Sequence, residues 1–290
     1  MLRFFKDKLK KSSVYNPHPP APIVFDTGVY NLGLALNKER NIFLVYGVGK
    51  RISCYCCIFT LEGELMTRVS LGFTIRLPIS RNPPFANFTD ERILLEMDGN
   101  IIREIFDSGV NVICFDAKII GVNEDGNYYV ILHHTSNFVI CSPSGTQLFS
   151  MNPSLEKWRN ERFFVADNTL FLLEICRRKQ THKISINIKR PKTQLNIHKY
   201  SLTTGEPLET ATYLIPPRFN RCSIDQSNNV IIDFRMSNEY CVCYSDGRVA
   251  DYKFEDEIKD GPITSEDFLI TENLQLIRIF ERECKIYNLL

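Results

Sequence analysis

Histidine is the side chain that could exchange protons or bind a metal most readily near neutral pH in this chain of 290 residues. The five histidines are His18, His133, His134, His182 and His198. None belongs to a His-Glu-x-x-His metal motif, and none lies beside a Gly-x-Ser-x-Gly elbow or a phosphate-binding glycine loop. His133 and His134 are adjacent after a strand-like run, so at most one of them points toward any given surface. We therefore predict that the protein is not an enzyme and has no catalytic residue, metal or cofactor.

Closely spaced cysteines could form metal half-sites or pack in a core. The two groups are Cys54-Tyr55-Cys56-Cys57 and Cys241-Val242-Cys243. Zinc ligands are usually paired in a turn at Cys-x2-Cys spacing, whereas residues i and i+2 of a strand face the same side. The ten cysteines lie in strand-like runs, and free cysteine behaves as a small buried hydrophobe in a reducing compartment. We expect free thiols in a core and a cytoplasmic protein.

The N-terminal segment combines apolar and basic side chains. Leu2, Phe5 and Leu9 fall at helical spacing with Phe4 beside them, and most of the remaining positions up to Lys11 are basic. This pattern predicts a short amphipathic helix, followed by a stiff proline-rich spacer. We assign residues 1–21 to this tail and linker. Its predicted contacts with a protein groove, or alternatively with an anionic membrane surface, are made by Leu2, Phe4, Phe5, Leu9, Lys10 and Lys11. The alternative is a frayed terminus, because so short a helix is marginal alone.

A second basic segment interrupts the later part of the chain. It runs from Arg177 to Thr193, and its isoleucines alternate with polar residues, which predicts a protruding hairpin with basic ends. Such a hairpin could bind phosphate, RNA or an acidic protein surface, or it could be a solvated loop. Aromatic side chains, on which single-stranded RNA stacks, are scarce here. The predicted contact residues are Arg177, Arg178, Lys179, Lys183, Lys189, Arg190 and Lys192.

Composition limits the classes of partner. The net charge is +1, so the overall field favours neither nucleic acid nor an anionic membrane. A hydrophobic content of 44% is sufficient for a proper core. No apolar run reaches the length of a membrane span, and the N-terminus lacks the apolar region of a signal peptide.

A glycine turn that recurs between apolar runs organises the whole chain. The turns contain Gly63, Gly99, Gly145, Gly205 and Gly247. Their intervals of 36, 46, 60 and 42 residues indicate a repeat with insertions. Glycine supplies the positive φ that a tight hairpin requires.

Turns rich in Asn and Asp lie upstream of the glycine turns, again between apolar runs. Short polar side chains favour such turns because they bond their own backbone. The third of them resembles part of a calcium loop but lacks the downstream bidentate Glu, so we read it as a hairpin turn. The six turns span residues 36–41, 88–92, 122–127, 166–169, 225–229 and 271–273.

One repeat therefore reads strand, Asx turn, strand, loop, strand, glycine turn, strand. We predict an all-β fold, a six-bladed β-propeller of four-stranded antiparallel blades, over residues 22–290 as a single domain. The sixth repeat ends before its fourth strand, which residues 22–27 are best placed to supply. Pairing the two termini in one blade would close the ring and remove the sheet edges there.

Two repeats depart from the pattern. The second, over residues 84–106, leaves room for three strands or four very short ones. The fourth carries the basic insertion, which we expect to extend its second and third strands.

The repeat resembles the NHL repeat of TRIM-NHL propellers. That family pairs an apolar residue, Asp and a downstream Asn with a later aromatic, Asp or Ser, and Gly. The matching residues here are Ile224-Asp225-Gln226-Ser227-Asn228-Asn229-Val230 with Cys243-Tyr244-Ser245-Asp246-Gly247, and Val122-Asn123-Glu124-Asp125-Gly126-Asn127-Tyr128 with Cys141-Ser142-Pro143-Ser144-Gly145. The resemblance implies a propeller that binds proteins or RNA, although some propellers of this shape are enzymes.

Three functions follow from this fold. We favour a non-catalytic protein–protein interaction scaffold, a subunit or adaptor of a larger intracellular assembly. The alternative is an RNA-binding NHL-like propeller. The third is a metal-dependent propeller hydrolase or lactonase, which needs polar ligands on the innermost strands. The predicted innermost strands (LGLAL, KIIGV, FFVA, CSI and FLI) are mostly apolar.

Overall fold

The structure is a computed structural model of the chain. It describes residues 20–49, 53–74, 86–90, 92–96, 101–106, 109–114, 118–123, 129–132, 138–142, 144–151, 161–166, 168–176, 193–215, 219–225, 227–234, 239–253 and 267–289. All regular structure in these ranges is β-strand, and none of their segments is a helix long and apolar enough to cross a membrane.

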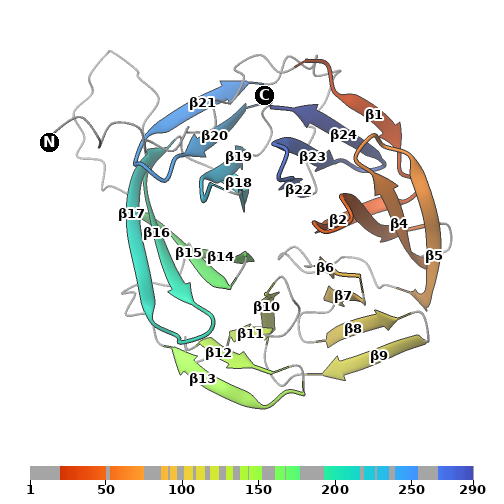
Figure 1. Ribbon diagram of the computed structural model, residues 1–290, viewed down its shortest axis with the longest axis horizontal. Helices are drawn as coiled ribbons and strands as arrows, with labels where there is room; N and C mark the ends of the chain where they lie inside the picture. Colours follow the sequence, from red (N-terminus) through yellow and green to blue (C-terminus); the bar gives the residue numbers. More distant parts are fainter. Residues whose placement is uncertain are drawn as a thin grey trace, which may run out of the picture.

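Six four-stranded antiparallel sheets are arranged around a central axis, which confirms the predicted β-propeller (Figure 1). Blade 1 contains β2 (Tyr30–Asn37), β3 (Ile42–Val48), β4 (Ser53–Thr60) and β5 (Leu65–Thr74). Blade 2 contains β6 (Ala86–Phe88), β7 (Ile93–Glu96), β8 (Ile101–Phe106) and β9 (Gly109–Cys114). Blade 3 contains β10 (Lys118–Val122), β11 (Tyr129–Leu132), β12 (Phe138–Cys141) and β13 (Gln147–Met151). Blade 4 contains β14 (Glu161–Ala166), β15 (Thr169–Cys176), β16 (Thr193–Ser201) and β17 (Pro207–Ile215). Blade 5 contains β18 (Phe219–Ile224), β19 (Val230–Phe234), β20 (Glu239–Cys243) and β21 (Val249–Lys253). Blade 6 contains β22 (Asp267–Ile270), β23 (Gln275–Ile279), β24 (Glu283–Asn288) and β1 (Ile23–Asp26).

The N-terminal strand closes the ring, as the sequence predicts. β1 pairs antiparallel with β24, from Ile23 opposite Ile286 to Asp26 opposite Glu283. The chain then passes into blade 1, where the buried Asn31 side chain donates to the Phe280 carbonyl at 2.7 Å. Blade 6 is consequently built from both ends of the described chain.

The hydrophobic core is divided among the interfaces between blades. Each of the six buried apolar clusters contains side chains from two neighbouring blades, and together they run around the whole ring. Successive residues of a strand point to opposite faces. Each central strand of a blade therefore contributes side chains to the two clusters that its blade shares with the neighbouring blades. This explains the short, continuous apolar runs in the sequence.

The predicted end of the second repeat at residue 106 is wrong, because blade 2 continues to Cys114 at the end of β9. The run from Ile101 to Phe106 is the third strand of blade 2, and Gly99 belongs to the connection between β7 and β8. The fourth strand is β9, which pairs with β8 from Gly109 opposite Phe106 to Cys114 opposite Ile101. A second glycine, Gly109, is the first residue of this outer strand.

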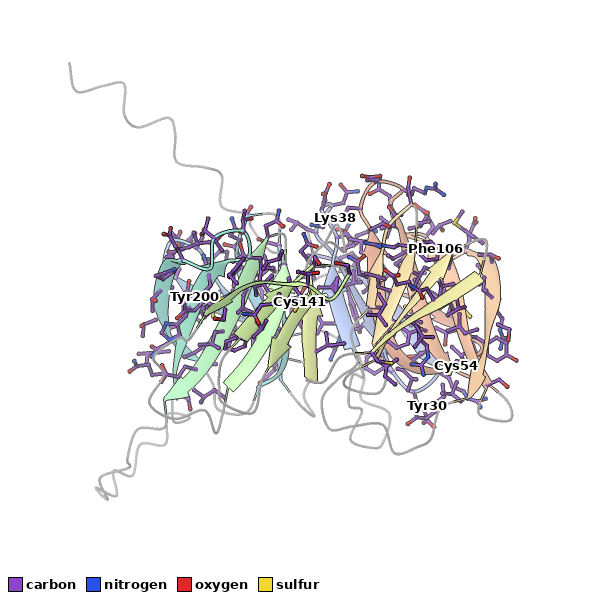
Figure 2. The ribbon with its side chains drawn as sticks, turned by 90° about the horizontal axis from the view of Figure 1, so that it is seen from below. Tyr30, Lys38, Cys54, Phe106, Cys141 and Tyr200 are labelled. Carbon is purple, nitrogen blue, oxygen red and sulfur yellow. The ribbon has the colours of Figure 1, made fainter. Side chains whose placement is uncertain are left out.

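The glycine turns that the structure describes adopt the expected backbone. Gly63, Gly145, Gly205 and Gly247 have φ between 75° and 91°. These turns precede the outer strands β5, β13, β17 and β21. Seen from the side, Lys38 and Phe106 lie toward one face of the ring, and Tyr30 and Cys54 lie toward the other (Figure 2).

The Asx turns form a chain of polar contacts between blades. The Asn37 amide donates to Asp90 at 2.8 Å, joining blades 1 and 2. The Asn123 amide donates to the Asn168 side chain at 2.8 Å, joining blades 3 and 4. Between them, the Asn87 amide donates to the Asn123 carbonyl at 3.3 Å. The turn residues therefore stabilise the ring as well as their own hairpins.

Candidate functional site

Both predicted contact segments lie outside the described residues. These are the tail residues Leu2, Phe4, Phe5, Leu9, Lys10 and Lys11 and the insertion residues Arg177, Arg178, Lys179, Lys183, Lys189, Arg190 and Lys192. The insertion does connect β15 to β16, the second and third strands of blade 4, as predicted. The contacts of both segments stay predictions.

His198 is the histidine that falls in the described part of the chain, and it belongs to a polar cluster on blade 4. Its Nδ1 lies 3.1 Å from the Thr210 hydroxyl oxygen, and its Nε2 lies 3.4 Å from Glu174 Oε2. The Glu174 carboxylate also accepts from the Asn196 amide at 2.7 Å. Asn196 Oδ1 in turn accepts from the Thr212 hydroxyl at 3.0 Å.

Strand register brings this polar face together. Thr210 is opposite His198, and both Glu174 and Thr212 are opposite Asn196, so these side chains share one face of β15, β16 and β17. Further along the same face, Leu172 and Tyr200 pack against blade 3. β15, β16 and β17 have 8, 9 and 9 residues, whereas β11, β12 and β13 have 4, 4 and 5. Blade 4 therefore extends beyond its neighbour, and the polar face begins where the apolar contact ends.

The chemistry of the polar face is limited by its own hydrogen bonds. A hydroxyl, an imidazole and a carboxylate in series can move a proton from Thr210 toward His198. Acyl transfer also needs N–H donors for the developing oxyanion. The nearby amides of Gln194 and Asn196 already donate within the cluster, to Asn196 Oδ1 and to Glu174. These hydrogen bonds hold the side chains of the polar face in fixed positions relative to one another.

A second candidate surface consists of exposed apolar side chains on three neighbouring blades. Leu65 and Met66 on β5 are 56% and 57% exposed, and Val110 and Val112 on β9 are 47% and 53% exposed. We name this set the apolar rim: Ile23, Val24, Leu65, Met66, Val69, Phe106, Val110 and Val112. It covers the outer parts of blades 6, 1 and 2. Exposed apolar side chains outside this set include Leu148 on β13 and Leu208 and Leu214 on β17.

The apolar rim continues outward from a buried aromatic cluster. The Phe25 ring lies 4.9 Å from Phe59, and Phe59 lies 5.6 Å from Phe43. A side chain at Gly63 would meet Phe25 and Ile23, so the turn before β5 lies directly against β1. Blades 6 and 1 are thus packed tightly where the rim begins.

Seven of the described cysteines pack in the core, as the sequence predicts, whereas Cys222 is half-buried and Cys114 on β9 is exposed. Cys54 and Cys56 face the interface of blades 1 and 2, Cys57 faces that of blades 6 and 1, and Cys241 and Cys243 face that of blades 4 and 5. Burial raises the pKa of the Cys56 and Cys284 thiols far above the usual range. Within the ranges that the structure describes, no three His, Cys, Asp or Glu side chains are placed to hold a metal ion.

The comparisons with known proteins identify the fold. No family model matches the chain, and no curated protein sequence matches it. A streptogramin B lyase structure has a TM-score of 0.54 and 13% identity, covering 93% of this chain and 97% of the lyase. A chain of the mitotic checkpoint complex has a TM-score of 0.54 and 9% identity, covering 97% of this chain and 94% of that one.

Raptor from Chaetomium thermophilum contains a similar region. Its TM-score is 0.53 at 9% identity, covering 94% of this chain and 29% of Raptor. Identities this low show a shared β-propeller architecture, and the same architecture carries unrelated functions.

The two surfaces were missed in the sequence analysis for different reasons. The alternation of Asn196, His198 and Tyr200 is visible in the sequence, but their partners on β15 and β17 depend on strand register. The consecutive Leu65 and Met66 are also visible, yet only the position of β5 at the outer edge of its blade leaves them exposed.

Proposed function

We propose that this propeller is a non-catalytic protein-interaction scaffold and that the apolar rim is its principal contact surface. The rim supports this proposal because it places eight large apolar side chains on three adjacent blades. Exposed apolar patches of this kind mark interaction sites in soluble proteins. A cytoplasmic location agrees with the buried free thiols.

The similar solved structures support the same class of function. One chain of the mitotic checkpoint complex, a complex of proteins, shares this architecture. At 13% identity the lyase similarity extends to the fold alone, and the side chains of the polar face of blade 4 are hydrogen-bonded to one another. We therefore favour binding over catalysis.

The predicted tail and basic insertion belong to the same proposal as additional contacts. The near-neutral net charge favours protein over RNA as the partner. Kinship with NHL repeats rests on the Asp225 and Asn229 turn, in which the Asp225 carboxylate accepts from the backbone of Ser227 and Asn229.

The proposal is tested by affinity purification of the tagged full chain from its native cells with quantitative mass spectrometry. The wild type is compared with Leu65→Asp/Met66→Asp and with Leu148→Asp. Leu148 is 47% exposed on β13, outside the apolar rim, so it controls for the added charge. Thermal unfolding of all three proteins checks that the fold is unchanged.

We expect a set of proteins that is retained by wild type and Leu148→Asp and lost from the double variant. The same set on all three proteins would overturn the proposal. Loss of the recovered proteins on RNase treatment would instead favour the RNA-binding alternative. Removal of residues 1–13 in parallel measures the contribution of the tail.

A further inference from the structure

The outer strand of each blade has one unpaired backbone edge, and proteins usually protect such edges from other strands. Proline, charged residues and β-bulges are the common protections. Five of the six outer strands carry at least one of them. β1 contains Asp26, β5 contains Arg68 and two register shifts, β13 pairs across a register shift, β17 contains Pro207 and Glu209, and β21 contains Asp251 and Lys253.

The edge of β9 has none of these protections. Its sequence, Gly-Val-Asn-Val-Ile-Cys, contains neither proline nor a charged residue, and it pairs with β8 over six consecutive residues without a register shift. In the described part of the chain β9 is the terminal strand of its sheet. Figure 1 shows it on the outside of blade 2.

The register of the β8–β9 hairpin indicates which backbone groups face outward. Phe106 and Gly109 pair across a two-residue connection, so this closing pair is hydrogen-bonded. Hydrogen-bonded and non-hydrogen-bonded pairs alternate along antiparallel strands. The N–H and C=O groups of Val110, Val112 and Cys114 are therefore directed toward the open edge.

The side chains beside this edge limit what can bind to it. Val110 and Val112 are half exposed and share a face with Arg103, which is opposite Val112 on β8. The other face carries Asn111, whose amide donates to the buried Glu104 at 2.9 Å. A strand added to β9 would meet two exposed aliphatic side chains on one face.

We propose that β9 binds an extended segment of a partner protein by strand addition, and that this segment has aliphatic residues at alternate positions. The main-chain bonds to Val110 and Val112 supply affinity, and the side chains of the two valines supply specificity. This inference rests on the proposed function and names its binding mode.

A partner segment fits this edge better than a second copy of the chain. Six residues of strand span about 20 Å, so pairing of two β9 strands alone falls short of the roughly 1,200 Å² that a stable interface buries.

The test selects peptides from a phage-displayed library of random twelve-residue sequences on the full-length protein. Enriched peptides are synthesised, their affinity is measured by fluorescence polarisation, and hydrogen exchange identifies the amides that they protect. Val112→Pro removes an outward N–H without removing a β8–β9 bond, and Val110→Lys adds the usual edge protection. Leu148→Lys on β13 and Val112→Thr are the matched controls.

We expect peptides with alternating aliphatic residues that protect Val110 and Val112. Affinity should fall about tenfold or more in Val112→Pro and Val110→Lys and stay within about threefold in the controls, because the main-chain contacts dominate in strand addition. If Val112→Pro unfolds, Val110→Lys alone decides. Wild-type affinity in both variants, or peptide protection of amides outside β9, would overturn the inference. The proposed function is tested separately, by the Leu65→Asp/Met66→Asp experiment.

Two further outcomes also overturn it. Absence of any enriched peptide would show that the edge does not accept an extended segment. A wild-type dimer in light scattering that Val110→Lys converts to a monomer would assign the edge to a second copy.

Discussion

At the scale of single residues, the turn between β2 and β3 shows how an Asx turn acts on its neighbour. Asn37 accepts from the backbone of Arg40 at 3.0 Å and donates to Asp90 of blade 2 at 2.8 Å. Arg40 Nε also lies 2.7 Å from Asp90 Oδ1. The hydrogen bond from Asn37, followed by the contact with Arg40, holds the pKa of the Asp90 carboxyl below its usual range.

This arrangement predicts an acid-sensitive contact between blades 1 and 2. Because the folded-state pKa is lowered, the contribution of ionised Asp90 to stability is complete above the unfolded value of about 3.9 and is lost as the pH falls through the folded value. We expect Asn37→Ala to raise the pKa of Asp90 more than Arg40→Gln does, as measured by NMR titration. A larger rise in Arg40→Gln would show that the ion pair dominates.

At the scale of elements, the innermost strand of blade 1 depends on a glycine opposite an aromatic ring. Gly33 on β2 is directly opposite the fully buried Tyr46 on β3, and the register shifts between Asn31 and Gly33. A Cβ at position 33 would overlap the ring and hydroxyl of Tyr46. The observed packing of β2 against β3 therefore requires that residue 33 has no side chain.

We predict that Gly33→Ala lowers the free energy of unfolding by about 1–3 kcal/mol, the usual cost of overpacking. In a Tyr46→Leu background, which removes the ring, the same substitution should cost clearly less. Urea unfolding of the two single variants and the double variant gives the coupling energy. Additive changes in the free energy of unfolding would show that the overlap with Tyr46 does not cause the destabilisation by Gly33→Ala.

At the scale of the whole molecule, the ring is closed by contacts between segments about 250 residues apart in sequence. The Asn31 amide donates to the Phe280 carbonyl, and the Thr27 hydroxyl oxygen lies 2.6 Å from Asn31 Oδ1. The backbone N–H groups of Thr27 and Asn31 donate to Arg282 and Glu281 carbonyls at 3.0 and 2.8 Å. Asn31 is fully buried at this junction.

We predict that Asn31→Ala destabilises the protein by about 1–3 kcal/mol, because it leaves a buried carbonyl without its donor. Glu281→Ala is the matched control, since the Glu281 side chain is exposed and its backbone carbonyl is retained. Urea unfolding measures both. An equal loss in the two variants would show that the side-chain bond of Asn31 does not stabilise the closure.

The sequence by itself determined the strands, the turns and the closure of the ring. These features depend on local chemistry, namely apolar runs, Asx turns and glycines at positive φ, together with an N-terminal strand that completes the last repeat. The division of Cys56 and Cys57 between two cores also follows, because alternate strand residues face opposite sides. Blade 2 was misassigned because Asp98-Gly99 has the local chemistry of a hairpin turn wherever it occurs in a blade.

Only the tertiary structure decided which side chains meet and which stay exposed. The contact of His198 with Glu174 and Thr210 depends on the register of three strands, and Leu65, Met66, Val110 and Val112 are exposed because their strands are the outermost of their blades. The same valines would be core residues on an inner strand. Position in the ring is a long-range property, which no local pattern of residues encodes.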